Sequence, residues 1–149
     1  MKNILVTVIF LLFTLCLTAQ DFDFVVGKIE NYKPVLTINQ DVALKSLSKN
    51  LFEASAIKET FTAVSITQVK DDSYSLVFKG ANYRTTFAVK AIGATLFAKS
   101  KVSCTTTGKE CIRDRQACRP TDDVGSCACT ACPGEEVCTK TCSSANLIK

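Results

Sequence analysis

The clearest structural pattern in the chain lies in residues 60–91, which read TFTAVSITQVKDDSYSLVFKGANYRTTFAVKA. Apolar and polar side chains alternate there with a period of two, which is typical of strands that bury one face. Turn signals at 70–73 and 80–82 divide the stretch into three strands, the first at 60–69. The predicted buried residues of the other two strands are Tyr74, Leu76, Phe78, Thr85, Phe87, Val89 and Ala91. Because the connections are short, we expect antiparallel neighbours.

Shorter patterns extend the predicted sheet on both sides. Alternation in residues 21–26 predicts a strand with Phe22, Phe24 and Val26 on one face, and a second apolar run follows at 35–38. Gly93 allows a tight turn or a bulge before another strand at 96–102. The whole is expected to form a curled meander of about four to six strands.

One helix is predicted between the run at 35–38 and the strand at 60–69. Its apolar residues recur at helical spacing: Leu44, Leu47, Leu51 and Phe52. We expect an amphipathic helix over about 41–54, with Asn39 or Asp41 as its N-cap. The predicted fold class is therefore α+β, an antiparallel meander sheet with one amphipathic helix, followed by a small disulfide-rich tail.

The tail contains eight of the nine cysteines of the chain. They are Cys104, Cys111, Cys118, Cys127, Cys129, Cys132, Cys138 and Cys142. Few other apolar residues follow position 103, so this piece cannot fold on burial alone, and disulfides are the usual remedy. We predict a disulfide-stapled module at 104–149 after an α+β domain at 20–103. Cys127 and Cys129 should bond to different partners, because their side chains point apart in an extended chain.

A metal site is the alternative use of these thiols. Cys129-x2-Cys132 and Cys138-x3-Cys142 have the spacing of two zinc half-sites, and a Cys-x2-Cys pair also occurs in redox proteins. The even number of cysteines in the tail, and the four thiols that one zinc would leave over, favour disulfides.

Residues 1–19 have the parts of a cleaved secretory signal peptide. Lys2 is followed by an apolar run at 4–17, and Ala19 offers a small residue before the predicted cut. The run would rise about 21 Å as a helix, short of the roughly 30 Å hydrocarbon core of a membrane. We therefore predict a secreted or periplasmic protein with no permanent membrane span after cleavage, and an uncleaved anchor is the alternative. Cleavage would also remove Cys16, the odd cysteine.

The composition argues against most catalytic chemistry. The chain has no histidine, which removes histidine-based nucleophile pairs, metal sites and general bases. The adjacent carboxylates at 71–72 and 122–123 lie in predicted turns, where aspartates usually bond local backbone. No glycine-rich phosphate loop and no lysine–arginine cluster is present, and the net charge is only +4. We predict no catalytic residues, no metal ligands, no cofactor and no nucleic-acid partner.

These observations favour a non-enzymatic binding or interaction protein with an unknown protein or surface partner outside the cytoplasm. A thiol-based metal-binding or redox tail is one alternative. Inhibition of a secreted protease is another, because a helix followed by consecutive antiparallel strands is similar in order to cystatin-like folds. The Gln-x-Val-x-Gly segment of cystatins does not occur in this sequence.

Overall fold

The computed structural model describes residues 22–123 and 125–149, and the predicted signal peptide at 1–19 lies outside them. The elements within these residues are β1 (Phe24–Glu30), β2 (Lys33–Leu36), α2 (Gln40–Ser55), β3 (Ala63–Lys70), β4 (Ser73–Lys79), β5 (Arg84–Ile92), β6 (Thr95–Ala98), β7 (Val102–Thr106), α3 (Lys109–Arg113) and β8 (Cys138–Cys142).

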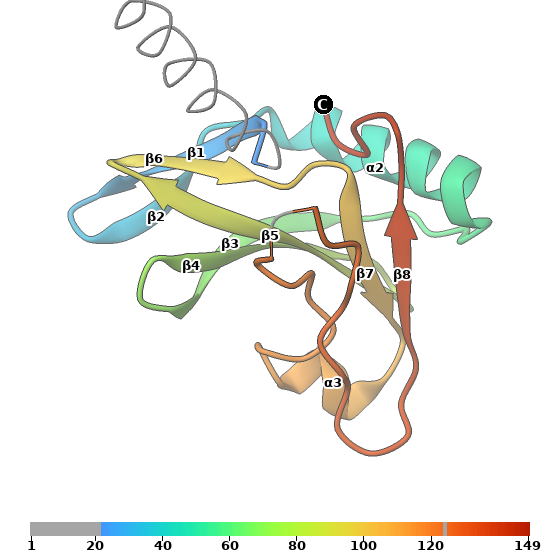
Figure 1. The fold of residues 1–149 in the computed structure, drawn as a ribbon. Helices are drawn as coiled ribbons and strands as arrows, with labels where there is room; N and C mark the ends of the chain where they lie inside the picture. The colour runs from blue at the N-terminus through green and yellow to red at the C-terminus, as the bar shows by residue number, and fades with distance from the viewer. Residues whose placement is uncertain (1–21, 124) are drawn as a thin grey trace, which may run out of the picture.

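The strands form one sheet of eight strands, in which every recorded pair is antiparallel. The main order is β2-β1-β6-β5-β4-β3, while β7 pairs with β5 and β8 with β7. The sheet curls almost into a barrel, and β2 returns to contact β3 (Figure 1). The predicted combination of an antiparallel sheet with one main helix is confirmed, although helix is a small part of the chain and the sheet has more strands than expected.

The core confirms the alternation in residues 73–92. Tyr74, Leu76 and Phe78 of β4 are buried, and so are Thr85, Phe87 and Val89 of β5. The ring of Phe78 makes edge contacts with the rings of Phe61 and Phe87, at centroid distances of 6.1 and 5.7 Å. Aromatic packing of this geometry adds to the stabilisation from area burial alone.

Helix α2 begins and ends within one residue of the expected bounds. Its apolar face differs from the prediction: Ala43, Leu47 and Leu51 are fully buried, whereas Leu44 is half-buried and Phe52 is 52% exposed. The buried stripe runs at i, i+4 and i+8, so the helix touches the core along a narrow line. Leu44 and Phe52 lie beside that line and line a groove described below.

The N-cap of α2 gives a stability prediction. The Asn39 side chain accepts a hydrogen bond from the backbone N–H of Val42 at 3.2 Å, as expected. Asn39→Ala is expected to lower the free energy of unfolding by about 1 kcal/mol, because this N–H loses its partner. Urea unfolding followed by far-UV circular dichroism measures the change. Asn39→Asp keeps an acceptor and should stay close to wild type, so equal losses in the two variants would contradict the capping role.

The expected strand at 96–102 is wrong, because the chain bends there. β6 pairs with Val89–Ile92 of β5, whereas β7 pairs with Arg84–Thr86 of the same strand. The bend is a turn in which the Val102 N–H donates to the Lys99 carbonyl at 3.3 Å, and the Lys99 N–H donates to the carbonyl of Ala88 in β5 at 2.9 Å. The Asp23 carboxylate accepts a hydrogen bond from the Ser100 hydroxyl at 2.7 Å, which holds the corner against the start of β1.

The N-terminal strand begins and ends later than predicted, because the expected strand covered 21–26 and β1 spans Phe24–Glu30. β1 begins at Phe24, and a bulge between Val25 and Gly27 places Val26 and Gly27 in succession on buried positions. A Cβ atom on Gly27 would collide with the Val35 carbonyl oxygen, so β1 and β2 approach each other closely at this residue.

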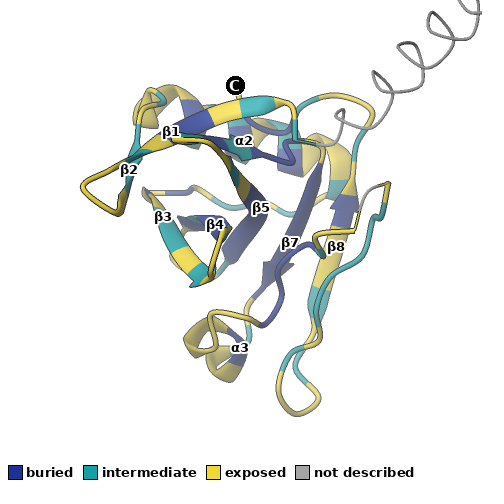
Figure 2. Cartoon of the chain, turned by 60° about the vertical axis from the view of Figure 1, so that its left-hand side comes forward, coloured by how far each residue is buried: buried dark blue, intermediate teal, exposed yellow. Residues whose placement is uncertain are grey.

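The cysteine-rich tail is built into the sheet. β7 runs across the predicted boundary at 103–104, and β8 adds to its free edge (Figure 1). Figure 2 shows β7 buried along its whole length. Leu147 and Ile148 enter the main core, and the Asn50 side chain of α2 donates to the carbonyl of Leu147 at 3.1 Å. The tail therefore packs on the first part of the chain.

Candidate functional site

The eight tail cysteines form four disulfides, which confirms the predicted use of these residues. The pairs are Cys104–Cys129, Cys111–Cys132, Cys118–Cys138 and Cys127–Cys142. Each of the first four tail cysteines bonds to the fourth cysteine after it, and Cys127 and Cys129 have different partners as expected. The Cα–Cα distances run from 5.0 to 6.2 Å, within the range that a disulfide spans.

Three of these disulfides form a second, sulfur-rich core. Cys104, Cys111 and Cys118 are fully buried around Ala117. The sulfur atoms fall into two triplets, each within 4.8 Å: Cys104, Cys129 and Cys138 in one, and Cys111, Cys118 and Cys132 in the other. The two cysteines of the Cys129-x2-Cys132 motif lie in different triplets. Sulfur in a disulfide is also not the thiolate that ligates a metal.

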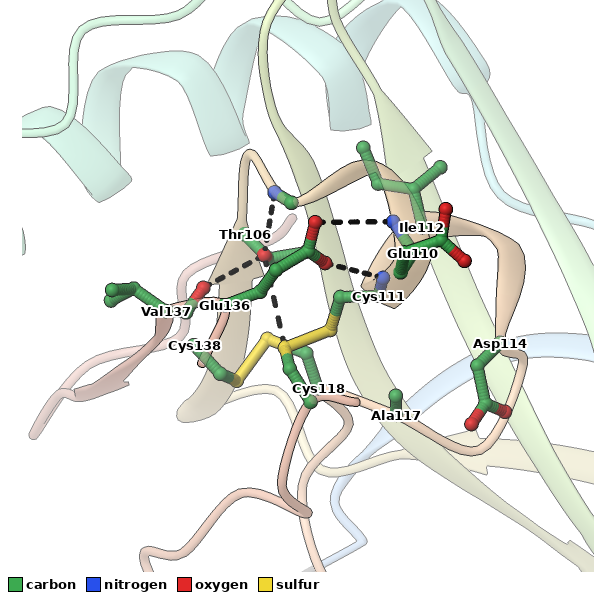
Figure 3. The surroundings of a disulfide bond; sticks show 12 residues. Thr106, Glu110, Cys111, Ile112, Asp114, Ala117, Cys118, Glu136, Val137 and Cys138 are labelled. Carbon is green, nitrogen blue, oxygen red and sulfur yellow. Dashed lines mark hydrogen bonds between the residues drawn. A yellow bond between two sulfur atoms is a disulfide. The ribbon is translucent and has the colours of Figure 1, made fainter. Parts of the chain in front are cut away.

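Hydrogen bonds between two tail segments position α3 (Figure 3). The Glu136 carboxylate accepts from the N–H groups of Glu110 and Cys111, at 3.2 and 2.7 Å. The Thr106 hydroxyl donates to the Val137 carbonyl at 2.8 Å. Together with the Cys111–Cys132 disulfide, these bonds fix the short helix beneath the sheet.

The sheet face toward α3 is polar, although it is buried. In β4 and β5 the residues that alternate with the core residues include Ser75, Arg84 and Thr86, with exposures of 2, 6 and 3%. Strand register places Lys79 opposite Arg84 and Val77 opposite Thr86. The tail thus covers a polar face of the sheet, while the main core lies on the other face.

Arg84 joins the sheet to the tail. Its guanidinium donates to the backbone carbonyls of Ile112, Asp114 and Ala117, at 2.9, 3.3 and 2.7 Å. These carbonyls belong to the end of α3 and the loop after it, where backbone oxygens have no helical partner. Burial lowers the pKa of the Arg84 guanidinium below its ordinary value, and the charge of Asp114 partly offsets this.

A pocket of about 170 Å³ lies between this sheet face and α3. Its cationic side chains are Lys79, Arg84, Arg113 and Arg115. Its hydroxyl side chains are Ser65, Thr67, Ser75 and Thr86. None of the residues that line it carries a carboxylate. Three buried polar atoms of the lining have no hydrogen-bond partner among the described residues: Ser75 Oγ, Arg84 Nε and Thr86 Oγ1. We refer to this hollow as the basic pocket.

Sequence reasoning missed the basic pocket. Ser75, Arg84 and Thr86 are the outward residues of an alternating pattern, which normally marks a solvent-facing side. The cations come from two segments that are about 30 residues apart in the chain, Lys79 and Arg84 in one and Arg113 and Arg115 in the other, so no single charge cluster shows in the sequence. The one sequence feature that points to the pocket is Arg84, an arginine within a strand pattern upstream of a tail poor in apolar residues. This feature is not specific for a binding site.

A second hollow of about 560 Å³ runs along α2. Leu44, Phe52 and Phe61 supply apolar surface, and charges of both signs surround them, including Lys45 and Glu59. Nothing among the described residues covers this groove.

Glu59 holds the turn between β4 and β5 at one end of that groove. Its carboxylate accepts hydrogen bonds from the N–H groups of Thr60, Asn82 and Tyr83, at 2.9, 2.9 and 3.1 Å. Burial acts to raise the pKa of Glu59, but these backbone hydrogen bonds and one from Ala81 together outweigh it, so the pKa lies below its ordinary value.

The lowered pKa of Glu59 predicts a pH-dependent contribution to stability. The ionised carboxylate stabilises the fold above the unfolded-state pKa of about 4.3, and this stabilisation is lost as the pH falls through the lower folded-state pKa. Glu59→Gln should therefore be less stable than wild type at pH 7, and the difference should shrink at pH 3. Urea unfolding of both proteins at the two pH values tests this. A difference that does not change with pH would contradict it.

The predicted turn aspartates occupy turns and make local contacts. The Asp122 carboxylate accepts from the Ser73 hydroxyl at 3.0 Å and pairs with Arg119 at 2.9 Å. It lies with Asp71 and Asp72 around a hollow of about 270 Å³, where Lys70 and Lys90 supply opposite charge. This hollow has no excess of cations of the kind found in the basic pocket.

Four disulfides are typical of proteins in an oxidising environment such as the extracellular space. In the part of the chain that the structure describes, no helix has the length and apolar character needed to cross a membrane. No known protein family, curated protein or solved structure matches this chain.

Proposed function

We propose that the protein is exported and acts outside the cytoplasm as a non-enzymatic binding protein, with the basic pocket as its binding site. The observation that carries this proposal is the set of buried polar atoms that line the pocket and find no hydrogen-bond partner in the part of the chain that the structure describes. Buried polar groups are nearly always paired in folded proteins, so a ligand that pairs them explains their presence. The disulfides that hold the tail in place supply a preformed site, as ligand sites usually are.

Two observations support binding rather than catalysis. The chain has no histidine, and the basic pocket has no carboxylate, so its hydroxyls lack an ordinary general base. The leader at 1–19 and the four disulfides support export. We propose that the group bound in the basic pocket belongs to a molecule or surface outside the cytoplasm.

The thiol state of the exported protein tests the proposal against a metal-binding or redox tail. Alkylation followed by intact-mass measurement, on denatured and chelator-treated protein without reductant, should find no reactive thiol and a chain that begins at Gln20. Eight reactive thiols would overturn the disulfide-stabilised site and favour the alternative. Turnover of any substrate in a broad hydrolase screen would overturn the non-enzymatic assignment.

A further inference from the structure

We infer that the basic pocket binds a tetrahedral oxyanion of the phosphate or sulfate class, either free or as an ester group of a larger ligand. This rests on the proposed function, because it names the ligand of the same site. The inference is carried by the charge of the lining, by the unpartnered donors within it and by its size.

All the charged side chains that line the basic pocket are cationic. Four cations meet there without a carboxylate. Lys79 and Arg115 take part in no recorded ion pair of the described chain, and Arg113 pairs only at the exposed surface with Glu110. The Asp114 carboxylate, whose charge acts on Arg84, accepts a hydrogen bond from the Gln116 N–H at 2.8 Å. Such a site attracts anions, and charge-assisted hydrogen bonds from guanidinium groups to oxyanions are among the strongest in proteins.

The unpartnered donors lie on adjacent strands of one sheet face. Thr86 and Arg84 alternate along β5, and Ser75 follows the same alternation on β4. The Nε–H of Arg84 can only donate, and each hydroxyl can donate as well. A ligand rich in acceptor oxygens therefore satisfies all three groups, whereas a cation leaves the Arg84 Nε–H unpaired and an apolar group satisfies none of them.

The size and the directions of the donors select the shape of the anion. A volume of 170 Å³ corresponds to about five or six water molecules, which is room for one small oxyanion group with some water. Donors come from two adjacent strands on one side of the pocket and from the segment after α3 on the other. A carboxylate accepts mainly in its own plane, whereas a tetrahedral anion presents oxygens in all these directions.

Isothermal titration of the full oxidised protein with inorganic phosphate, sulfate and acetate tests the inference. We expect saturable binding of one phosphate or sulfate per chain, weakened by added sodium chloride, and clearly weaker binding of acetate. Titration with glycerol phosphate and with a sulfated monosaccharide distinguishes a free anion from an ester group of a larger ligand. Tighter binding of an ester assigns the anion to a larger ligand, and binding of the inorganic ions alone assigns a free anion. No saturation up to tens of millimolar, or equal binding of acetate, overturns the inference.

Variants at the exposed rim keep the test independent of folding. Lys79→Gln with Arg115→Gln is expected to weaken binding by about tenfold, because two charge-assisted contacts are lost. The matched control, Lys33→Gln with Lys45→Gln, removes the same charge from β2 and α2 and should leave affinity within about twofold. Equal losses in both pairs would show nonspecific attraction and overturn the site.

Thr86→Val separates binding from stability. It removes a buried hydroxyl that has no hydrogen-bond partner within residues 22–123 and 125–149, so the melting temperature without ligand should stay the same or rise. Affinity for the anion should fall, because the ligand loses one donor. Unchanged affinity would remove Thr86 from the site and contradict the inferred contact. Absence of anion binding in a protein with no reactive thiol and no turnover would reject the inference alone, whereas eight reactive thiols would reject the proposed function.

Discussion

Replacing Arg84 by alanine is expected to lower the free energy of unfolding by about 3–5 kcal/mol. Arg84 is 6% exposed, and its guanidinium donates to three backbone carbonyls of the tail. Without it, the carbonyls of Ile112, Asp114 and Ala117 lose a charged donor at the place where the tail meets the sheet. Burial of the charge opposes folding, as the lowered pKa of Arg84 shows, so the hydrogen bonds must outweigh this cost in the native protein.

The effect of Arg84→Ala should not vary between pH 5 and pH 9. Arginine is protonated in both the folded and the unfolded state over this range, even with its pKa lowered, so the two states bind equal numbers of protons at this residue. Urea unfolding at several pH values, followed by far-UV circular dichroism, measures both the size of the loss and its flat pH dependence. A loss that changes steeply across this range would contradict the assigned role.

Two further variants show whether the stability loss of Arg84→Ala comes from the lost hydrogen bonds or from another cause. Arg84→Met keeps much of the side-chain volume but removes the donors, so it should lose nearly as much stability as Arg84→Ala. Arg113→Ala removes a neighbouring arginine whose ion pair with Glu110 is solvent-exposed, and it should change stability by less than about 0.5 kcal/mol. Wild-type stability of Arg84→Met would show that packing, and not the bonds to the tail, holds this residue.

The parts of the fold that could be predicted depend on local periodicity. The helix over Gln40–Ser55, its Asn39 cap and the buried residues of β4 and β5 follow from spacings within one segment. The split between β6 and β7 could not be predicted, because the connecting segment Lys99-Ser100-Lys101 contains neither glycine nor proline to indicate a turn. The bend depends on pairing with two halves of β5 and on the contact with Asp23, both of which are remote in sequence.

The candidate site was beyond sequence reasoning for a different reason. Outward residues such as Ser75 and Thr86 look like a solvated face, and they are buried only because the tail lies over them. The position of the tail depends on its disulfide connectivity, and eight cysteines allow 105 pairings. The apolar pair Leu147 and Ile148 likewise looks isolated at the end of a polar tail, and its place in the main core follows from the return of β8 along β7.

The tail that covers the basic pocket depends on the disulfide between Cys104 and Cys129. Cys104 lies in β7 directly opposite Thr86, so this bond ties the tail to the sheet beside the pocket. Replacing both cysteines by alanine is expected to lower the free energy of unfolding by about 4–5 kcal/mol. Loop closure over 25 residues accounts for about 3.5 kcal/mol of this in the chain-entropy model, and the lost packing of buried sulfur accounts for about 1 kcal/mol.

The disulfide between Cys127 and Cys142 provides the matched control. It closes 15 residues and lies nearer the surface, so its removal by the same double alanine replacement should lower the free energy of unfolding by only about 3 kcal/mol. The chain has no tryptophan, so circular dichroism is the appropriate probe for both unfolding curves. Losses that differ by only about 0.5 kcal/mol, as the two loop lengths predict, would mean that the sulfur-rich core stabilises the protein through chain entropy alone. A difference of about 1 kcal/mol or more would show that the packing of the buried pair also holds the tail against the pocket.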